Sequence, residues 1–229
     1  MSLERVISAI TGISQSHLWD HTTASVAQIM SWASRRETTR VKDIAYSLMG
    51  LFNVNMPPLY GEGTRAFQRL QLEILASSND ESLFAWERKG LADQRHLGLL
   101  ADSPLFQWPS RHLQDTACHR PHRPPFSMTN KGLRIEMDLL PNTSKGKYLA
   151  PLNCANGINR QIAIVLYPER DIEEEIPNSS GVMCKRIGIL TSLSDSDRQR
   201  YRLNATKAVI LVKQPPCNQT RRFCSDNCA

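Results

Sequence analysis

Residues 39–52 read TRVKDIAYSLMGLF, and they carry the strongest periodic pattern in the chain. Their apolar side chains recur at helical spacing, at Val41, Ile44, Ala45, Leu48 and Phe52. Thr39 stands just before this pattern, where its hydroxyl can accept a hydrogen bond from a free helix amide. The stretch therefore predicts an amphipathic helix with Thr39 as its N-cap.

A helix is predicted on either side of this one. Ser25 and Gln28 form a capping-box pattern ahead of apolar residues that continue at helical spacing. Residues 53–58 are predicted to break the central helix, because Pro57 and Pro58 lack amide donors. The helix that follows them is predicted to bury Ala66, Phe67, Leu70 and Ile74. Residues 1–80 should therefore form a cluster of helices.

The periodicity changes to two in the second half of the chain. Apolar residues alternate with charged ones at Leu133, Ile135, Met137 and Leu139, which predicts a half-buried strand. Residues 126–129 can pair with this strand through a turn at residues 130–132. Further short strands are predicted at residues 82–86, 148–152, 162–167, 186–190 and 208–212. Helices before strands indicate an α+β fold, an N-terminal helical cluster followed by a mostly antiparallel β-rich module.

Three parts are predicted along the 229 residues: a helical part at 1–80, a β-rich module at 81–215 and a basic, cysteine-containing tail at 216–229. We expect the tail to be disordered, and we expect surface loops at residues 107–125 and 172–181. No apolar stretch approaches the ~20 residues that a membrane-spanning helix needs. Charged residues interrupt the N-terminal stretch where a signal peptide needs an apolar run. These features predict a cytoplasmic protein with no membrane partner.

The net charge of +6 comes from the C-terminal end of the chain. Residues 198–229 hold seven Lys or Arg against Asp226 alone, whereas the preceding residues are balanced. Such a tail could contact phosphates, but it carries no stacking motif, so nucleic acid is not the expected partner.

The sequence carries no motif that indicates catalysis. It lacks a G-x-S-x-G elbow, and its six histidines have no recognisable Ser or Cys partner. Its six cysteines lack the close pairs of structural zinc sites, and without a signal peptide we expect reduced thiols. We therefore expect no enzyme activity, catalytic residue, cofactor or metal.

The corner between the first two predicted helices is strongly polar. Arg35, Arg36 and Arg40 could hold a phosphate or a partner's carboxylate, with Glu37 beside them. In the structural alternative, the first two arginines satisfy helix-end carbonyls while Glu37 and Asp43 pair with Arg40 or Lys42. We favour the structural alternative, because cations are expected at a helix end for the helix dipole alone. The corner remains the candidate interaction or anion-binding site.

Two nearby features are predicted to be structural. Residues 59–63, LYGEG, lack the spacing of a phosphate loop and are predicted to form a tight turn, with Glu62 facing the N-terminus of the next helix. Trp32 and Trp86 are predicted to pack in the core or at its edge.

Residues 25–86, SVAQIMSWASRRETTRVKDIAYSLMGLFNVNMPPLYGEGTRAFQRLQLEILASSNDESLFAW, resemble the distal part of fungal heterokaryon-incompatibility (HET) domain proteins. The later pieces GLLADSPLFQW, FSMTNKGLRIEMDLLP and YLAPLNC look like the poorly characterised region that follows the HET domain. The resemblance covers roughly residues 7–215 and does not include the proximal part of that domain. One departure is Lys42, where the family pattern has Glu; Lys cannot complete a capping box with Thr39.

The resemblance implies a non-catalytic interaction or scaffold part of a heterokaryon-incompatibility protein, acting in non-self recognition and programmed cell death. The chain would then be truncated, and its partner would be another protein or the missing N-terminal HET region. An NAD-consuming or hydrolytic cell-death effector is the alternative. A weak nucleic-acid binder acting through the basic tail is the second alternative.

Overall fold

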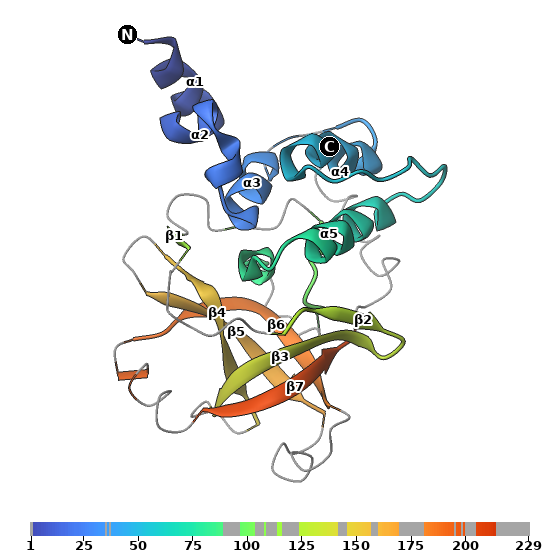
Figure 1. Ribbon diagram of the computed structural model, residues 1–229, viewed down its shortest axis with the longest axis vertical. Helices are drawn as coiled ribbons and strands as arrows, with labels where there is room; N and C mark the ends of the chain where they lie inside the picture. The colour runs from blue at the N-terminus through green and yellow to red at the C-terminus, as the bar shows by residue number, and fades with distance from the viewer. Residues whose placement is uncertain are drawn as a thin grey trace, which may run out of the picture.

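The computed structural model has helices in its N-terminal part and a β-rich sheet after them, so the predicted α+β class is confirmed (Figure 1). The structure describes residues 2–34, 36, 38–88, 97–103, 108, 114–115, 124–141, 146–156, 160–169, 181–194, 196–197, 199 and 205–213. The tail at 216–229 lies outside these residues, as does most of the loops expected at 107–125 and 172–181.

The helical part contains α1 (Leu3–Thr11), α2 (Gln15–Trp19), α3 (Val26–Ala33), α4 (Val41–Phe52) and α5 (Arg65–Ser77), with the 3-10 helices η1 (His21–Thr23) and η2 (Glu81–Phe84). The three predicted helices correspond to α3, α4 and α5, and the capping box of Ser25 and Gln28 is present. No helix within the described residues combines the length and the apolar character that crossing a membrane requires.

The start of α4 differs from the prediction. Its N-cap is Arg40, not Thr39, because the backbone of Arg40 is still extended at φ −123° and ψ 130°. No side-chain hydrogen bond caps this end. The N3 position therefore belongs to Asp43 rather than to Lys42, and its amide donates to the Arg40 carbonyl at 2.9 Å.

The strand predicted at residues 82–86 is wrong, since residues 81–84 form η2. Its Asp80 N-cap accepts a hydrogen bond from the Ser82 amide at 2.8 Å and another from the Val26 amide of α3 at 2.7 Å. The Ser82 hydroxyl accepts from the Ala27 amide at 3.0 Å. The apolar run of η2 is therefore buried as a helical turn beneath α3, held by contacts that a local pattern does not contain.

The sheet has seven strands: β1 (Gln114–Asp115), β2 (Ser127–Thr129), β3 (Gly132–Pro141), β4 (Tyr148–Ala155), β5 (Gln161–Pro168), β6 (Val182–Ser192) and β7 (Thr206–Val212). The predicted hairpin is β2–β3, and four other predicted strands lie within β4, β5, β6 and β7. All pairs are antiparallel except β6–β7, which is parallel.

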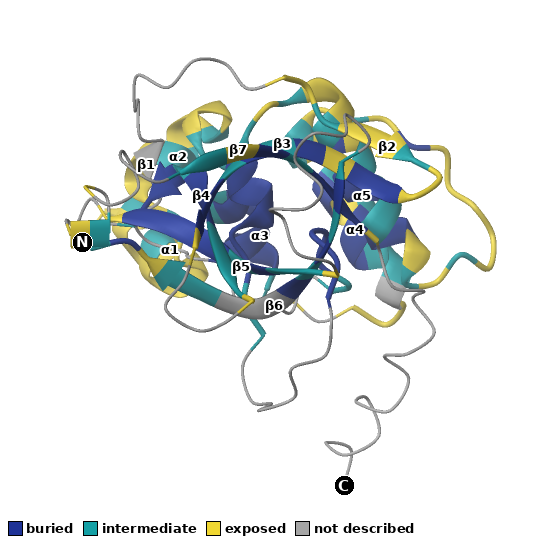
Figure 2. Ribbon diagram, turned by 90° about the horizontal axis from the view of Figure 1, so that it is seen from below, coloured by how far each residue is buried: buried dark blue, intermediate teal, exposed yellow. Residues whose placement is uncertain are grey.

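The sheet closes on itself. Its order is β1-β4-β5-β6-β7-β3-β2, and an additional β4–β3 pairing joins Leu140 to Leu149 and Pro141 to Tyr148. Strands β3, β4, β5, β6 and β7 therefore form a ring, which Figure 2 shows from below. The predicted alternation along β3 is confirmed, because Leu133, Ile135, Met137 and Leu139 are all buried.

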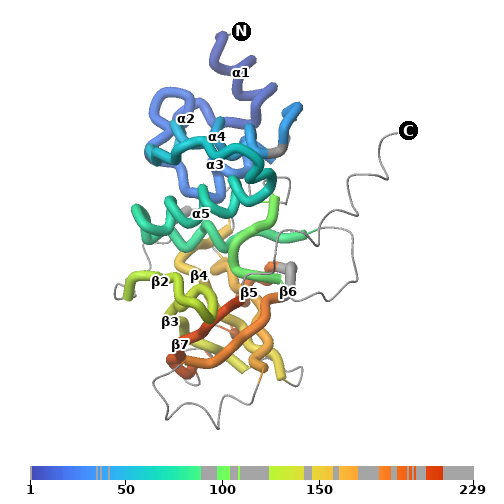
Figure 3. The backbone as a smooth tube through the Cα atoms, turned by 90° about the vertical axis from the view of Figure 1, so that its right-hand side faces the viewer, coloured from blue at the N-terminus to red at the C-terminus, as the bar shows by residue number. Residues whose placement is uncertain are grey.

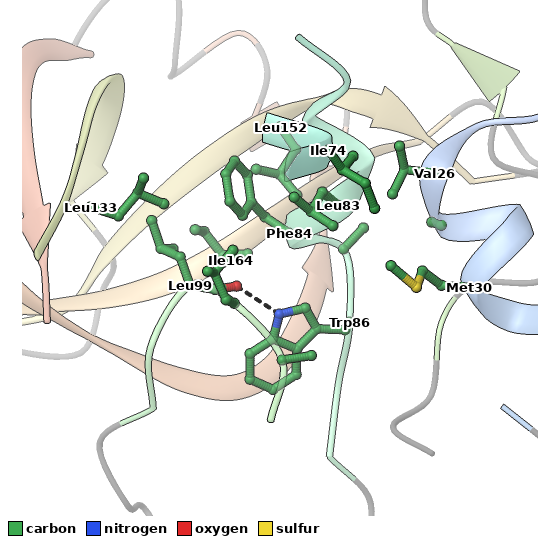
Figure 4. Packing of buried hydrophobic residues seen from close by; sticks show 14 of the residues in the cluster. Val26, Met30, Ile74, Leu83, Phe84, Trp86, Leu99, Leu133, Leu152 and Ile164 are labelled. Atoms are coloured by element: carbon green, nitrogen blue, oxygen red, sulfur yellow. Dashed lines mark hydrogen bonds between the residues drawn. The ribbon is translucent and has the colours of Figure 1, made fainter. Parts of the chain in front are cut away.

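The helices cover one end of this ring. In Figure 3, α5 lies nearest the strands and α1 lies farthest from them. One hydrophobic cluster runs from α3 through η2 into the ring, and it includes Met30, Phe84 and Ile164 (Figure 4). The division of the chain at residue 80 remains a prediction.

A buried cation lies in this core. Arg186 of β6 has no exposed surface, and its guanidinium lies 4.0 Å from the centre of the Trp86 ring. It donates to the carbonyls of Trp86 and Leu99, while the Trp86 indole also donates to the Leu99 carbonyl at 2.7 Å (Figure 4). Burial lowers the pKa of Arg186 to about 9, so the side chain is still charged at neutral pH. Trp86 thus packs in the core, as predicted.

Candidate interaction site

The structure describes half of the predicted arginine corner. Arg36 and Arg40 are exposed, whereas Arg35 and Glu37 lie outside the described residues. The Arg36 amide donates to the Ala33 carbonyl at 2.9 Å and so continues the last turn of α3. Within the part of the chain that the structure describes, neither guanidinium forms an ion pair. Both cations therefore face solvent.

A loop next to the start of α4 extends this corner. Lys42, in the first turn of α4, places its ammonium 5.7 Å from the centre of the Tyr60 ring. Tyr60 is fully exposed at 101%, and Leu59 before it is 48% exposed. Arg40 lies two residues before Lys42 at the same end of α4. We call Arg40, Lys42, Leu59 and Tyr60 the tip surface.

Tyr46 of α4 holds the loop behind the tip surface. Its hydroxyl accepts a hydrogen bond from the Leu59 amide at 3.0 Å and donates one to the Glu62 carboxylate. Met56, earlier in the same loop, is buried in the core at 1% exposure. The loop is therefore fixed on both sides of the exposed pair.

Arg69 of α5 holds the same loop from the other side. Its guanidinium forms an ion pair with Glu62 at 3.3 Å and donates to the Pro57 carbonyl at 2.6 Å. The Glu62 side chain is only 8% exposed, so its charge is balanced mainly by Arg69. Gly61 and Gly63 adopt positive φ angles of 79° and 55°, which lets the chain turn sharply around this carboxylate.

These contacts refine the prediction for residues 59–63. The segment does turn tightly, but the Glu62 carboxylate binds Tyr46 and Arg69 rather than facing the N-terminus of α5. The exposed pair, Leu59 and Tyr60, was not predicted. A weak signal existed, because Leu59 and Tyr60 stand between two prolines and a glycine, where a loop exposes its side chains.

Glu62→Gln is expected to lower the free energy of unfolding by about 1–3 kcal/mol, because Arg69 loses its carboxylate while its Nε already has no partner. Amide hydrogen exchange at Leu59 and Tyr60 should accelerate. Glu73→Gln, at an exposed position of the same helix as Arg69, should change urea denaturation by less than about 0.5 kcal/mol. Equal effects of the two substitutions would contradict the role of Glu62.

The polar groups of the described residues do not gather into a metal site. No group of three His, Cys, Asp or Glu side chains among them is arranged to hold an ion. Cys154 and Cys184 are both buried. The tip surface presents an aromatic ring and an aliphatic side chain on a fixed loop, together with two cations at the start of α4. This composition is suited to protein recognition.

Comparison with known proteins gives two partial similarities. Residues 65–131 match a family described as "Domain of unknown function (DUF8212)". The chain is also similar to "Vegetative incompatibility protein HET-E-1" of Podospora anserina, at 41% identity over 122 residues. That alignment covers 47% of this chain and 9% of the relative, so the chain matches a small part of a much longer protein. No solved structure matches.

The second similarity confirms the expected likeness to incompatibility proteins at a coarse level. The matched family is of unknown function and is not a HET domain.

Proposed function

We propose that this chain is a non-catalytic interaction part of a vegetative-incompatibility protein. The similarity to the Podospora anserina protein supports the assignment of this chain to the vegetative-incompatibility system. The tip surface supports the interaction role, because Tyr and Arg side chains dominate binding energy at protein interfaces. The partner is a protein or a HET region, and the chain acts in the cytoplasm.

The observation that carries the proposal is the exposure of Tyr60 on a loop that three hydrogen bonds and one ion pair hold in place. A fully exposed aromatic ring gains nothing from the hydrophobic effect in the free protein. A loop fixed around such a ring is ready to bind a partner with little further loss of conformational entropy.

A competition experiment tests the proposal. Expression of this chain during an incompatibility reaction in Podospora anserina is expected to lower the fraction of dying cells severalfold, because an inert interaction part occupies the partner of the complete protein. An unrelated globular protein expressed at the same level should leave the fraction unchanged. Unchanged death in the presence of the chain would contradict the proposal.

Incubation of the purified chain with NAD separates this proposal from its enzymatic alternative. We expect no release of nicotinamide above the rate of a protein-free control. Release that disappears after substitution of a single carboxylate would establish an effector enzyme and overturn the proposed role.

A further inference from the structure

We infer that the tip surface docks an acidic protein segment that carries a bulky apolar side chain. This inference rests on the proposed function, since it names the chemistry of the partner. Arg40 and Lys42 supply the positive charge, while Leu59 and Tyr60 supply the apolar contact.

Among the residues that the structure describes, no carboxylate neutralises the charge of the tip surface. Glu62 is the acid closest in the loop, but its two oxygens are bound to Tyr46 and Arg69. Asp43 is partly buried in the first turn of α4, and within the described residues it forms no ion pair with Arg40 or Lys42. Arg36 adds a third exposed cation at the end of the preceding corner. A carboxylate-bearing partner therefore meets a surface with an excess of positive charge.

The apolar contact is of the kind that anchors an interface. Lys42 lies against the Tyr60 ring and leaves the rest of that ring open. A partner's Leu, Met or Phe could pack on the open part of the ring and on the half-exposed Leu59. Its carboxylates would meet the Lys42 ammonium over the ring and the Arg40 guanidinium at the same end of α4.

The exposed apolar side chains of α1 offer no such complement of charge. Leu3 and Ile10 of α1 are more exposed than Leu59, but the only charges of this helix are Glu4 and Arg5, which cancel. The face of α1 therefore gives no indication of what covers it. The charge of the tip surface, in contrast, indicates an acidic partner.

The arrangement favours a protein over a nucleic acid. Single-stranded nucleic acids bind along grooves in which several aromatic side chains stack successive bases. The tip surface has one aromatic ring next to an aliphatic side chain, which suits a single apolar anchor.

Selection from a displayed library of random twelve-residue peptides tests the inference with the full chain. We expect enriched peptides to carry net negative charge and at least one bulky apolar residue. Leu59→Ser combined with Tyr60→Ala should weaken their binding at least tenfold in fluorescence polarisation, and Lys42→Glu should weaken it by a similar factor. Affinity should fall as NaCl is raised.

Matched substitutions elsewhere provide the controls. Met128→Ser removes a side chain of 47% exposure from β2, and Lys131→Glu reverses an exposed charge in the β2–β3 turn. Both should leave peptide affinity within twofold of the original. Equal thermal melting of all variants excludes unfolding as the cause of any loss.

The inference is overturned if no peptide is enriched, if enriched peptides lack acidic residues, or if the double substitution leaves their affinity unchanged. It is also overturned if a twenty-nucleotide RNA binds through the same residues more tightly than any selected peptide. Peptide binding without suppression of cell death would refute the proposed function and leave the docking surface standing. Suppression of cell death that survives the double substitution would refute the docking surface alone.

Discussion

Trp86→Ala is expected to lower the free energy of unfolding by about 3–5 kcal/mol. The indole is 1% exposed, donates to the Leu99 carbonyl and forms the surface on which the Arg186 guanidinium stacks. Its removal leaves a cavity in the core and takes away the aromatic face of a fully buried cation. Urea denaturation followed by far-ultraviolet circular dichroism measures the change.

Trp19→Ala is the matched control, because Trp19 is 79% exposed at the end of α2. Its substitution should change the free energy of unfolding by less than about 0.5 kcal/mol. A loss of under about 1 kcal/mol for Trp86→Ala would mean that the junction of Trp86, Leu99 and Arg186 does not stabilise the core.

Gly132→Ala is expected to lower the free energy of unfolding by about 2–4 kcal/mol. Gly132 opens β3 at φ +127°, and an added Cβ would lie 2.5 Å from the Val212 carbonyl oxygen of β7. That neighbour is backbone in the longest antiparallel pairing of β3, so it cannot move aside without breaking strand register. Thermal unfolding and amide exchange along β7 measure the loss.

Gly146→Ala separates the effect of the close contact from that of backbone conformation. Gly146 has φ +72°, but no atom lies within 4 Å of the position that its Cβ would take. Only the left-handed conformation is then penalised, at about 1 kcal/mol. Equal losses for the two alanine variants would show that the contact with Val212 carries no cost.

Local periodicity correctly predicted the helices and strands that bury only one of their faces. The helical spacing in α4 and the alternation in β3 each follow from a single buried side, and the structure has both. The pattern failed at residues 82–86, where every apolar side chain is buried and no face is distinguished. There the backbone follows tertiary hydrogen bonds from α3 that a sequence window does not contain.

The closure of the sheet into a ring could not be predicted from the sequence either. The five strands of the ring were predicted, whereas β1 lies in a predicted loop, but ring formation depends on which strands pair. The contact between β3 and β4 involves two residue pairs at the end of β3, and the parallel β6–β7 pair joins strands with a long connection between them. Such pairings between distant segments produce no periodic pattern of residues in the sequence.

The tip surface shares only Arg40 with the predicted corner; Lys42, Leu59 and Tyr60 were not predicted as part of a site. Arg36 and Arg40 are exposed, and the other two predicted corner residues, Arg35 and Glu37, lie outside the described residues. The loop that exposes Tyr60 is held by a hydrogen bond from the Leu59 amide to Tyr46 and by one from Arg69 to the Pro57 carbonyl, and these two side chains belong to different helices. Sequence spacing does not indicate that these side chains meet beneath one loop.

The hydrogen bonds at the N-terminus of α3 affect the order in which the helices are completed during synthesis. Val26 and Ala27 donate their amides to side chains that follow them by 54 and 55 positions. A ribosome delivers those side chains only after all of α4 and α5 have been synthesised. The order of synthesis therefore differs from the order of completion, and α3 acquires its finished N-terminus last among the three central helices.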